Sequence, residues 1–330
     1  MRAFIHAAAE SIRRHAVLTY FGLVLLISYG SFALLEGPTV LRGGIPGAAI
    51  TEEALFPILV VSVAVVGLAL TGVVSGRRGV RDVFARIGRW RVGVGWYAVA
   101  LLLPPAGILV VLFALRAFVS SAFTPKLFVF GFLFGLPAIL EEIGWMGFAF
   151  PQMRKRQSAL AAAITLGALW GLWHAPVVDY LGSAAPHRAY WPLFFLAFIG
   201  IVSAMRVLIV WVYSNTGKSL LLAMVMHISM TGSLVAFAPV GISAAQETLW
   251  YALYAVLLWI IVGLVALRSG TRLSRMQPPH SAADLRFERG SAPGGRRLPD
   301  MALKGAIEGD IGVIADARRD LAKTQAGLLQ

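Results

Sequence analysis

The stretch Glu141-Glu142-Ile143-Gly144-Trp145-Met146-Gly147-Phe148 lies inside an otherwise apolar run over residues 127–150. Such a run is long enough to cross a bilayer, because a transmembrane helix needs about 20 apolar residues. An ionised carboxylate is costly in hydrocarbon, so an acidic side chain inside a membrane span indicates a functional site by default. The two adjacent glutamates therefore predict both a membrane protein and the place of its chemistry.

The composition of the whole chain supports this class. Hydrophobic residues make up 58% and charged residues only 14%, with a mean hydropathy of +0.77, whereas soluble domains carry about 25% charged residues. The net charge of +13 comes from arginines beside apolar runs, which is the positive-inside pattern and predicts no nucleic-acid partner. The chain has no cysteine, which excludes disulfides, thiolate metal ligands and a cysteine nucleophile.

Eight runs of about 20 apolar residues predict an all-α fold, a polytopic bundle of about eight transmembrane helices. The runs lie near residues 16–35, 55–75, 92–115, 127–150, 160–181, 191–213, 219–238 and 248–267. With eight crossings, the basic connections at 76–91 and 151–157 fall on the same side as both termini. We therefore expect both termini to be cytoplasmic, in a multi-pass protein of the cell membrane in contact with lipid.

Composition also divides the chain into two parts. Residues 1–267 form the expected transmembrane domain. From residue 268 the chain turns to Arg, Gly, Pro, Ser and Asp, which cannot bury enough apolar surface to fold. The sequence predicts a disordered cytoplasmic tail over residues 268–330.

Ionisable side chains inside the expected spans gather on four neighbouring spans. They are Glu141 and Glu142 in span 127–150, His174 in span 160–181, Arg206 in span 191–213 and His227 in span 219–238. Intramembrane ionisable groups face the bundle interior or a water-filled cavity. The pattern predicts one polar site built from these four spans.

Small residues indicate close packing around this site. Gly131 and Gly135 have the small-xxx-small spacing in span 127–150, and Gly167 and Gly171 have it in span 160–181. This spacing lets helix backbones approach closely and is also frequent in ordinary membrane-helix packing.

Glutamate and histidine without cysteine leave three kinds of chemistry open. A Glu or Glu/His pair can draw a proton from water that attacks a carbonyl, while a second His donates a hydrogen bond to the oxyanion. Alternatively, a Glu and two His can hold a metal with an open position for water. The same groups could instead form the proton relay of a transporter.

Three stretches of residues 125–235 resemble the motifs of a known family, the CPBP intramembrane proteases, also called the CAAX prenyl protease and bacteriocin-processing (Abi) family. That family carries a Glu-Glu-x-x-x-Arg motif, an aromatic-x-x-x-His motif and a His-x-x-x-Asn motif on successive helices. The matching stretches here run from Glu141 to Phe148, from Trp170 to Pro176, and from Trp211 through His227 to Thr231.

The resemblance implies an endopeptidase that cuts a peptide bond of a protein or peptide at or in the membrane. It implies that Glu141 and His174 activate the attacking water, and that His227 and Thr231 stabilise the oxyanion. It leaves metal dependence open; a divalent metal such as zinc would take Glu141, His174 and His227 as ligands.

Two residues depart from the family pattern, because Met146 stands at the place of the Arg and Thr231 at the place of the Asn. Met146 cannot neutralise Glu142, so we expect Arg206, well inside span 191–213, to supply the positive charge. Thr231 keeps one hydroxyl donor of shorter reach than an amide. A catalytically weak or inactive scaffold or immunity protein of the same fold, and a proton-coupled transporter, therefore remain alternatives.

Overall fold

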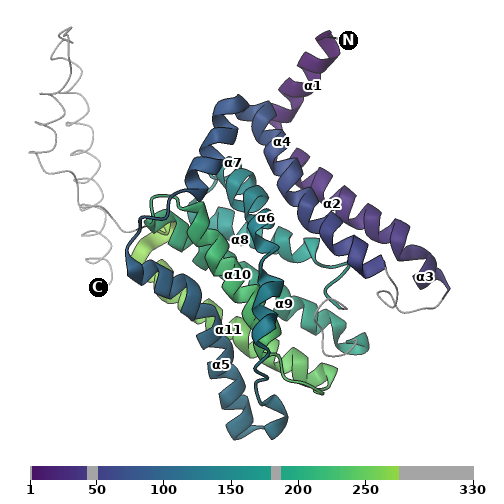
Figure 1. Ribbon diagram of the computed structural model, residues 1–330, viewed down its shortest axis with the longest axis vertical. Helices are drawn as coiled ribbons and strands as arrows, with labels where there is room; N and C mark the ends of the chain where they lie inside the picture. Colours follow the sequence, from purple (N-terminus) through teal and green to yellow (C-terminus); the bar gives the residue numbers. More distant parts are fainter. Residues whose placement is uncertain (1, 43–50, 180–186, 275–330) are drawn as a thin grey trace, which may run out of the picture. The chain divides into compact units, whose positions relative to one another are not determined.

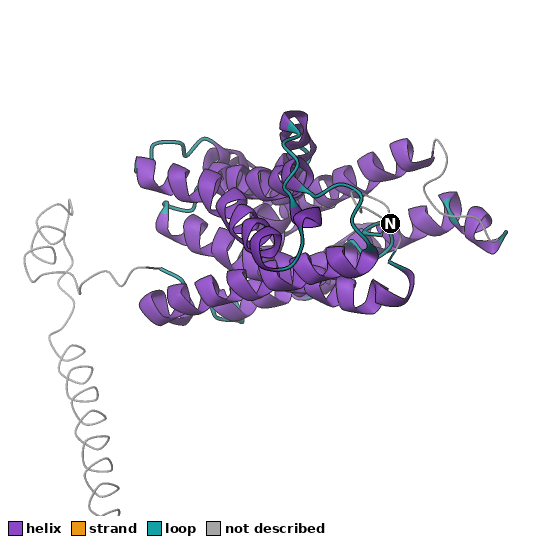
Figure 2. Cartoon of the chain, turned by 90° about the horizontal axis from the view of Figure 1, so that it is seen from below, coloured by secondary structure: helices purple, strands orange, loops and turns teal. Residues whose placement is uncertain are grey.

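The computed structural model describes residues 2–42, 51–179 and 187–274. Throughout these residues the chain forms helices joined by turns and loops, and they contain no strand (Figure 2). The all-α prediction is confirmed for this part of the chain. Most of the predicted tail lies outside the described residues, because the description ends at Ser274.

Seven helices of the described residues are long and apolar enough to cross a membrane. They are Ala16–Leu35, Leu55–Ile87, Val94–Phe118, Val129–Met153, Arg188–Asn215, Leu220–Phe237 and Ala244–Arg272. In Figure 1 they correspond to α2 (Ala16–Leu35), α4 (Thr51–Ile87), α5 (Val94–Phe118), the composite helix from η2 (Val129–Gly135) to α7 (Phe150–Met153), η4 (Arg188–Tyr190) with α9 (Trp191–Asn215), α10 (Leu220–Phe237), and α11 (Ala244–Ser269) with η5 (Gly270–Arg272). Shorter helices are α1 (Arg2–Arg14), α3 (Gly37–Leu41) and η1 (Ser121–Phe123).

The expected span over 160–181 is shorter than predicted. Helix α8 runs over Ala159–Trp173, whose 15 residues rise about 22 Å, less than the roughly 30 Å of a hydrocarbon core. It begins at Ser158, whose hydroxyl accepts from the Ala161 backbone N–H at 3.1 Å. It ends before Pro176, because a proline disfavours the helical conformation of the residue before it. His174 therefore caps the end of α8 instead of lying within a long helix.

The run over 127–150 also differs from a uniform helix. It passes from the 3₁₀-helix η2 through α6 (Ala138–Gly144) into the π-helical turn η3 (Trp145–Ala149) and then α7. Gly135 allows η2 to approach α10, since a Cβ at Gly135 would lie 2.3 Å from the Ile228 carbonyl oxygen. A π-turn inside a helix frequently marks a functional site.

Helix α4 continues into the basic segment that we expected to be a connection. Gly76, with φ 63° and ψ −165°, breaks the helix into two pieces, and the second piece reaches Ile87. Its apolar residues Val80, Val83 and Ile87 recur at helical spacing, and Val83 is buried. Part of the 76–91 segment is therefore a structural helix in contact with the core.

Helix α9 is the most enclosed of the long helices, because 72% of its most apolar stretch is buried. It packs against α8, α10 and α11 (Figure 1). Gly167 of α8 makes the close approach to α9, because a Cβ on it would lie 2.5 Å from the Ser203 Cα. The small-residue spacing predicted from the sequence thus serves the contact that positions Arg206.

Gly167→Ala is expected to destabilise the protein by about 1–3 kcal/mol, since the added methyl group would overpack the contact between α8 and α9. The control is Gly263→Ala in α11, where a Cβ meets nothing within 4 Å. That change should be neutral or stabilising, because Ala is the better helix former. Thermal unfolding of both purified variants in detergent checks the difference. Equal effects of the two substitutions would contradict the close contact.

Candidate active site

The six residues singled out in the sequence lie on four neighbouring elements of the described structure. Glu141 and Glu142 are on α6, His174 caps α8, Arg206 is on α9, and His227 and Thr231 are on α10. Direct contacts join Glu142, Arg206 and His227, and Trp170 links Glu141 and His174 to this buried polar cluster.

Glu142 is the anion at the centre of an ion-pair network. The Arg206 Nη1 lies 2.8 Å from Glu142 Oε1 and 2.9 Å from Oε2, and His227 Nδ1 lies 2.8 Å from Oε1. Glu142 and Arg206 are both fully buried. An ionised carboxylate at this depth is tolerated only when it is paired and hydrogen-bonded. Arg206 thus stands where the departure at Met146 led us to expect the charge.

The other face of Arg206 meets an aromatic ring. Its guanidinium carbon lies 4.4 Å from the centroid of Trp170, a distance at which a cation is attracted to the ring face. Within the described residues, no hydrogen-bond acceptor reaches the Nε or Nη2 of Arg206. The guanidinium is therefore held between the Glu142 carboxylate and the Trp170 π-system.

Glu141 has different partners from its neighbour. The indole N–H groups of Trp145 and Trp170 both donate to Glu141 Oε2, at 3.2 Å and 3.0 Å. No described residue donates a hydrogen bond to Oε1, and the side chain is nearly buried. Glu141 is therefore oriented by two donors and keeps one oxygen to accept a proton or a hydrogen bond from water.

His174 is fixed in orientation and in tautomer. Its Nδ1 lies 2.9 Å from the Trp170 carbonyl oxygen, an acceptor, so Nδ1 must carry the hydrogen. The ring packs edge-on against Trp170, Trp173 and Phe198, with centroids at 5.6, 4.6 and 5.1 Å. The neutral ring thereby presents Nε2 as an acceptor, which suits a general base.

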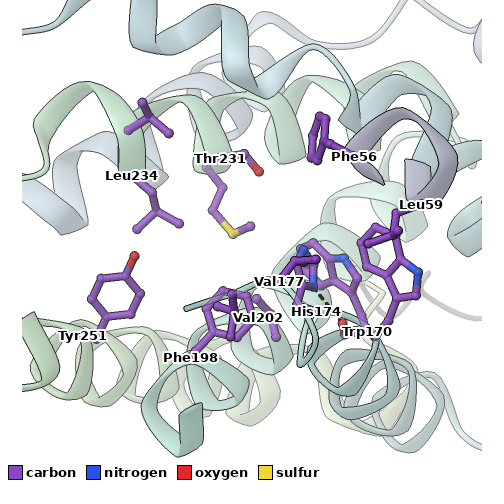
Figure 3. A pocket seen from close by; sticks show the side chains of 14 residues that line it. Phe56, Leu59, Trp170, His174, Val177, Phe198, Val202, Thr231, Leu234 and Tyr251 are labelled. Carbon is purple, nitrogen blue, oxygen red and sulfur yellow. Dashed lines mark hydrogen bonds between the residues drawn. The ribbon is translucent and has the colours of Figure 1, made fainter. Parts of the chain in front are cut away.

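A cavity of about 140 Å³ is lined by His174 and Thr231 together (Figure 3). Its walls are otherwise mainly apolar and aromatic, with Trp170 on one side and Phe198 and Tyr251 on another. An apolar cavity with a few polar groups is the usual form of a small binding site. Two of the predicted site residues thus face a space that could hold a reacting group.

Trp170 contacts more of the cluster than any residue that the sequence analysis selected. It donates to Glu141, accepts from His174 through its carbonyl, stacks on Arg206, and its ring centroid lies 4.7 Å from that of His227. The sequence placed it only as the start of the aromatic-x-x-x-His motif. Its position four residues before His174, on the same helix face, was the available signal.

Arg86 is the second residue that sequence reasoning missed, since it was counted among the loop arginines. It is 5% exposed and donates to the carbonyl oxygens of Met146 at 3.2 Å and Gly147 at 3.0 Å. These carbonyls belong to the π-turn η3, directly after the glutamate pair. Arg86 therefore satisfies backbone groups of the irregular segment that carries Glu141 and Glu142.

The hypothetical metal ligands are not gathered into a coordination sphere. Among the described residues, no group of three His, Asp, Glu or Cys side chains is placed to hold a metal ion. In this arrangement Glu141 is held by two indoles, whereas His227 is bound to Glu142. Glu141, His174 and His227 as placed therefore do not fit a metal site.

Over the part of the chain that the structure describes, the fold and the cluster define a class: all-helical, with seven helices suited to cross a membrane and a buried Glu/His/Arg site carried by neighbouring helices. A family model described as "Type II CAAX prenyl endopeptidase Rce1-like" matches residues 122–233. That segment is thus an Rce1-like segment of the CPBP family, and the resemblance predicted from the motifs is confirmed. It contains all six predicted site residues.

A curated relative points to the same family. The protein "CAAX prenyl protease 2" of Methanococcus maripaludis is 32% identical over 112 residues. The alignment covers 33% of this chain and 39% of that protein, so the chain matches well under half of its relative's length.

Proposed function

We propose that this protein is an intramembrane endopeptidase that hydrolyses a peptide bond of a membrane-associated protein or peptide. The observation that carries the proposal is the cavity lined by His174, Thr231 and Trp170, within a segment that matches a peptidase family. The Trp170 indole N–H in turn donates to the Glu141 carboxylate. Intramembrane carboxylates and histidines that face a cavity are typical of function.

The proposed base is the pair of His174 and Glu141. A water in the cavity attacks the scissile carbonyl carbon while His174 Nε2 accepts its proton, and Glu141 Oε1 orients the water or shares that proton. The tetrahedral intermediate then expels the amine as the C–N bond breaks, and His174 returns the proton to the amine nitrogen. The two indole donors on Glu141 hold the carboxylate still during these transfers.

The proposed oxyanion donors are Thr231 and His227. The Thr231 hydroxyl lines the cavity and can donate to the developing negative charge. Because His227 Nδ1 already donates to Glu142, its Nε2 can donate only when the ring is protonated. Glu142 accepts from Nδ1 and fixes the orientation of the ring, so it would act as a positioning residue for His227.

We also propose the finer topology. If α8 and the residues that follow it count as a crossing, eight crossings place both termini on the side of the basic 76–91 and 151–157 segments, which is cytoplasmic by the positive-inside rule. Residues 1–267 would then form the membrane domain in lipid, followed by a cytoplasmic tail over 268–330.

Glu141→Gln tests the proposed activity. The amide oxygen still accepts from Trp145 and Trp170, whereas the group can no longer take a proton, so the variant should fold and fail to cut. We expect its natural substrate to accumulate uncut in membranes, as measured by mass spectrometry of membrane peptides. The comparison strain carries the wild-type chain at the same level. Identical peptide profiles in both strains would exclude an endopeptidase that depends on Glu141.

The departures at Met146 and Thr231 favour one alternative, a non-catalytic protein of the same fold that binds its partner without cutting. That protein would retain its cellular role in the Glu141→Gln strain. A proton-coupled transporter would instead lose a substrate-dependent proton flux in reconstituted vesicles.

A further inference from the structure

A second pocket, of about 450 Å³, lies where α7 and α9 end and α8 begins, away from the cavity described above. Three basic side chains line it, Arg154, Lys218 and Arg272. Tyr213, Ser214 and Ser274, which carry hydroxyl groups, line it as well, and no acidic residue does. A concave site with three cations and three hydroxyls, and no anion of its own, suits an anionic ligand.

The cations of this pocket are not neutralised by a carboxylate, and the backbone at two of them is fixed by hydrogen bonds. Among the described residues, none of the three takes part in an ion pair. Lys218 sits in a left-handed turn, with φ 63° after Gly217 at φ 61°, and its N–H donates to the Tyr213 carbonyl at 3.0 Å. Arg272 precedes the buried Leu273, whose carbonyl accepts from Asn215 Nδ2 at 2.9 Å. These hydrogen bonds therefore fix the backbone positions from which the Lys218 and Arg272 side chains extend.

Tyr213 supplies an oriented donor. Its side chain is 4% exposed, and its hydroxyl oxygen accepts from Arg86 Nη1 at 2.8 Å. Within the described residues no acceptor takes the hydroxyl hydrogen. The hydroxyl hydrogen of this lining residue therefore has no partner among the described residues, and Arg86 also connects the hydroxyl to the π-turn η3.

We propose that this pocket binds a phosphate group, carried by the headgroup of an anionic phospholipid. Arginine binds phosphate oxygens in pairs and lysine binds them as a point charge, while the hydroxyls complete the hydrogen bonds. Phe150, Pro151 and Ala159 give the pocket an apolar wall at the end of the membrane helices. Basic pockets between transmembrane helices are typical sites for phosphate-bearing lipid headgroups.

The test compares two triple variants of the full-length protein purified in detergent. The pocket variant combines Arg154→Gln, Lys218→Asn and Arg272→Gln; asparagine is chosen because it tolerates the left-handed conformation at Lys218. The control variant combines Arg77→Gln, Arg78→Gln and Arg81→Gln, which are exposed residues of α4. Both variants remove three positive charges. Native mass spectrometry measures binding of phosphatidylglycerol and phosphatidylcholine to each.

We expect the wild type to prefer phosphatidylglycerol, and the pocket variant to lose about a hundredfold in affinity for it. The control variant should stay within about threefold of the wild type, because exposed distant charges are screened. Unfolding temperatures without lipid should be equal in all three proteins, since the substituted side chains are exposed. Equal losses in the two variants, or equal binding of both lipids by the wild type, would overturn the proposal.

Inorganic phosphate distinguishes the two sources of the ligand. If millimolar phosphate displaces phosphatidylglycerol from the wild type and its own binding is lost in the pocket variant, the pocket recognises the phosphate group whatever carries it. If phosphate does not compete while the variant still loses lipid, the headgroup together with its chains is the ligand, which also supports the proposal. Failure of this experiment leaves the proposed peptidase untouched, because none of the substituted residues belongs to its site.

Discussion

Arg206→Met is expected to destabilise the protein by about 3–5 kcal/mol, the largest loss of stability that we predict. The substitution removes the partner of Glu142 and leaves an uncompensated buried carboxylate, which is the costly way to break a buried ion pair. Both side chains are fully buried, and the Arg206 Nη1 contacts both carboxylate oxygens within 2.9 Å. The loss also removes the cation from the face of Trp170.

A double-mutant cycle with Glu142→Gln isolates the pair. The double variant should recover much of the stability lost in Arg206→Met, because no buried charge then remains alone. Unfolding of the purified proteins in detergent micelles measures all four corners of the cycle. Arg14→Met serves as the matched control, since Arg14 pairs with Glu10 on an exposed helix and its loss should cost under about 1 kcal/mol. Equal costs for Arg206→Met and Arg14→Met would contradict the buried pairing.

The pairing of Arg206 with Glu142 illustrates what the sequence could reveal. A buried charge in an apolar medium must be paired with an opposite charge. Because position 146 is a methionine and position 206 is an arginine, the sequence predicted that Arg206 pairs with Glu142. The same constraint placed Glu141, His174, Arg206 and His227 on one site. The assignment of catalytic roles to them stays a prediction.

Helix boundaries were predictable where only hydropathy decides them and not where tertiary contacts do. The run over 16–35 coincides with α2. The run over 127–150 changes helix type because Gly131 and Gly135 lie against the backbone of α10, where a Cβ would come within 2.7 and 2.3 Å of backbone atoms. Hydropathy along one segment carries no information about a neighbouring backbone.

Hydrogen bonds to backbone carbonyls explain why the sequence analysis missed Arg86 and the role of Trp170. Arg86 binds the carbonyls of Met146 and Gly147, and His174 binds the carbonyl of Trp170. Every residue has a backbone carbonyl, so the sequence does not indicate which carbonyl is available to accept a hydrogen bond from a side chain. The π-turn η3, which includes Met146 and Gly147, contacts α4 and α10, so its geometry depends on tertiary packing.

Trp170 also changes the meaning of the motif to which it belongs. In the sequence it is an aromatic residue one turn before a histidine. In the structure its indole N–H, carbonyl and ring face each hold a different site residue: Glu141, His174 and Arg206. The aromatic-x-x-x-His spacing therefore links the proposed base to the buried ion pair through one side chain.

His174→Ala is expected to lower kcat for peptide cleavage by about 10²–10⁴-fold, the usual contribution of a positioned general base. The ring is held by the Trp170 carbonyl and by three aromatic neighbours, and the residues that line the cavity include no second histidine and no carboxylate. The measurement is single-turnover cleavage of a substrate identified by the membrane-peptide comparison. Tyr251→Phe is the control, because it alters the same cavity without removing a base.

Combining His174→Ala with Glu141→Gln distinguishes a working pair from two independent contributors. If His174 and Glu141 activate one water together, the double variant should be hardly slower than the slower single variant, because residues that act as a unit are strongly non-additive. Multiplied losses would mean that Glu141 acts at a separate step. An unchanged kcat in His174→Ala, with the fold intact by thermal unfolding, would remove His174 from the reaction and leave Glu141 as the only base that the proposal retains.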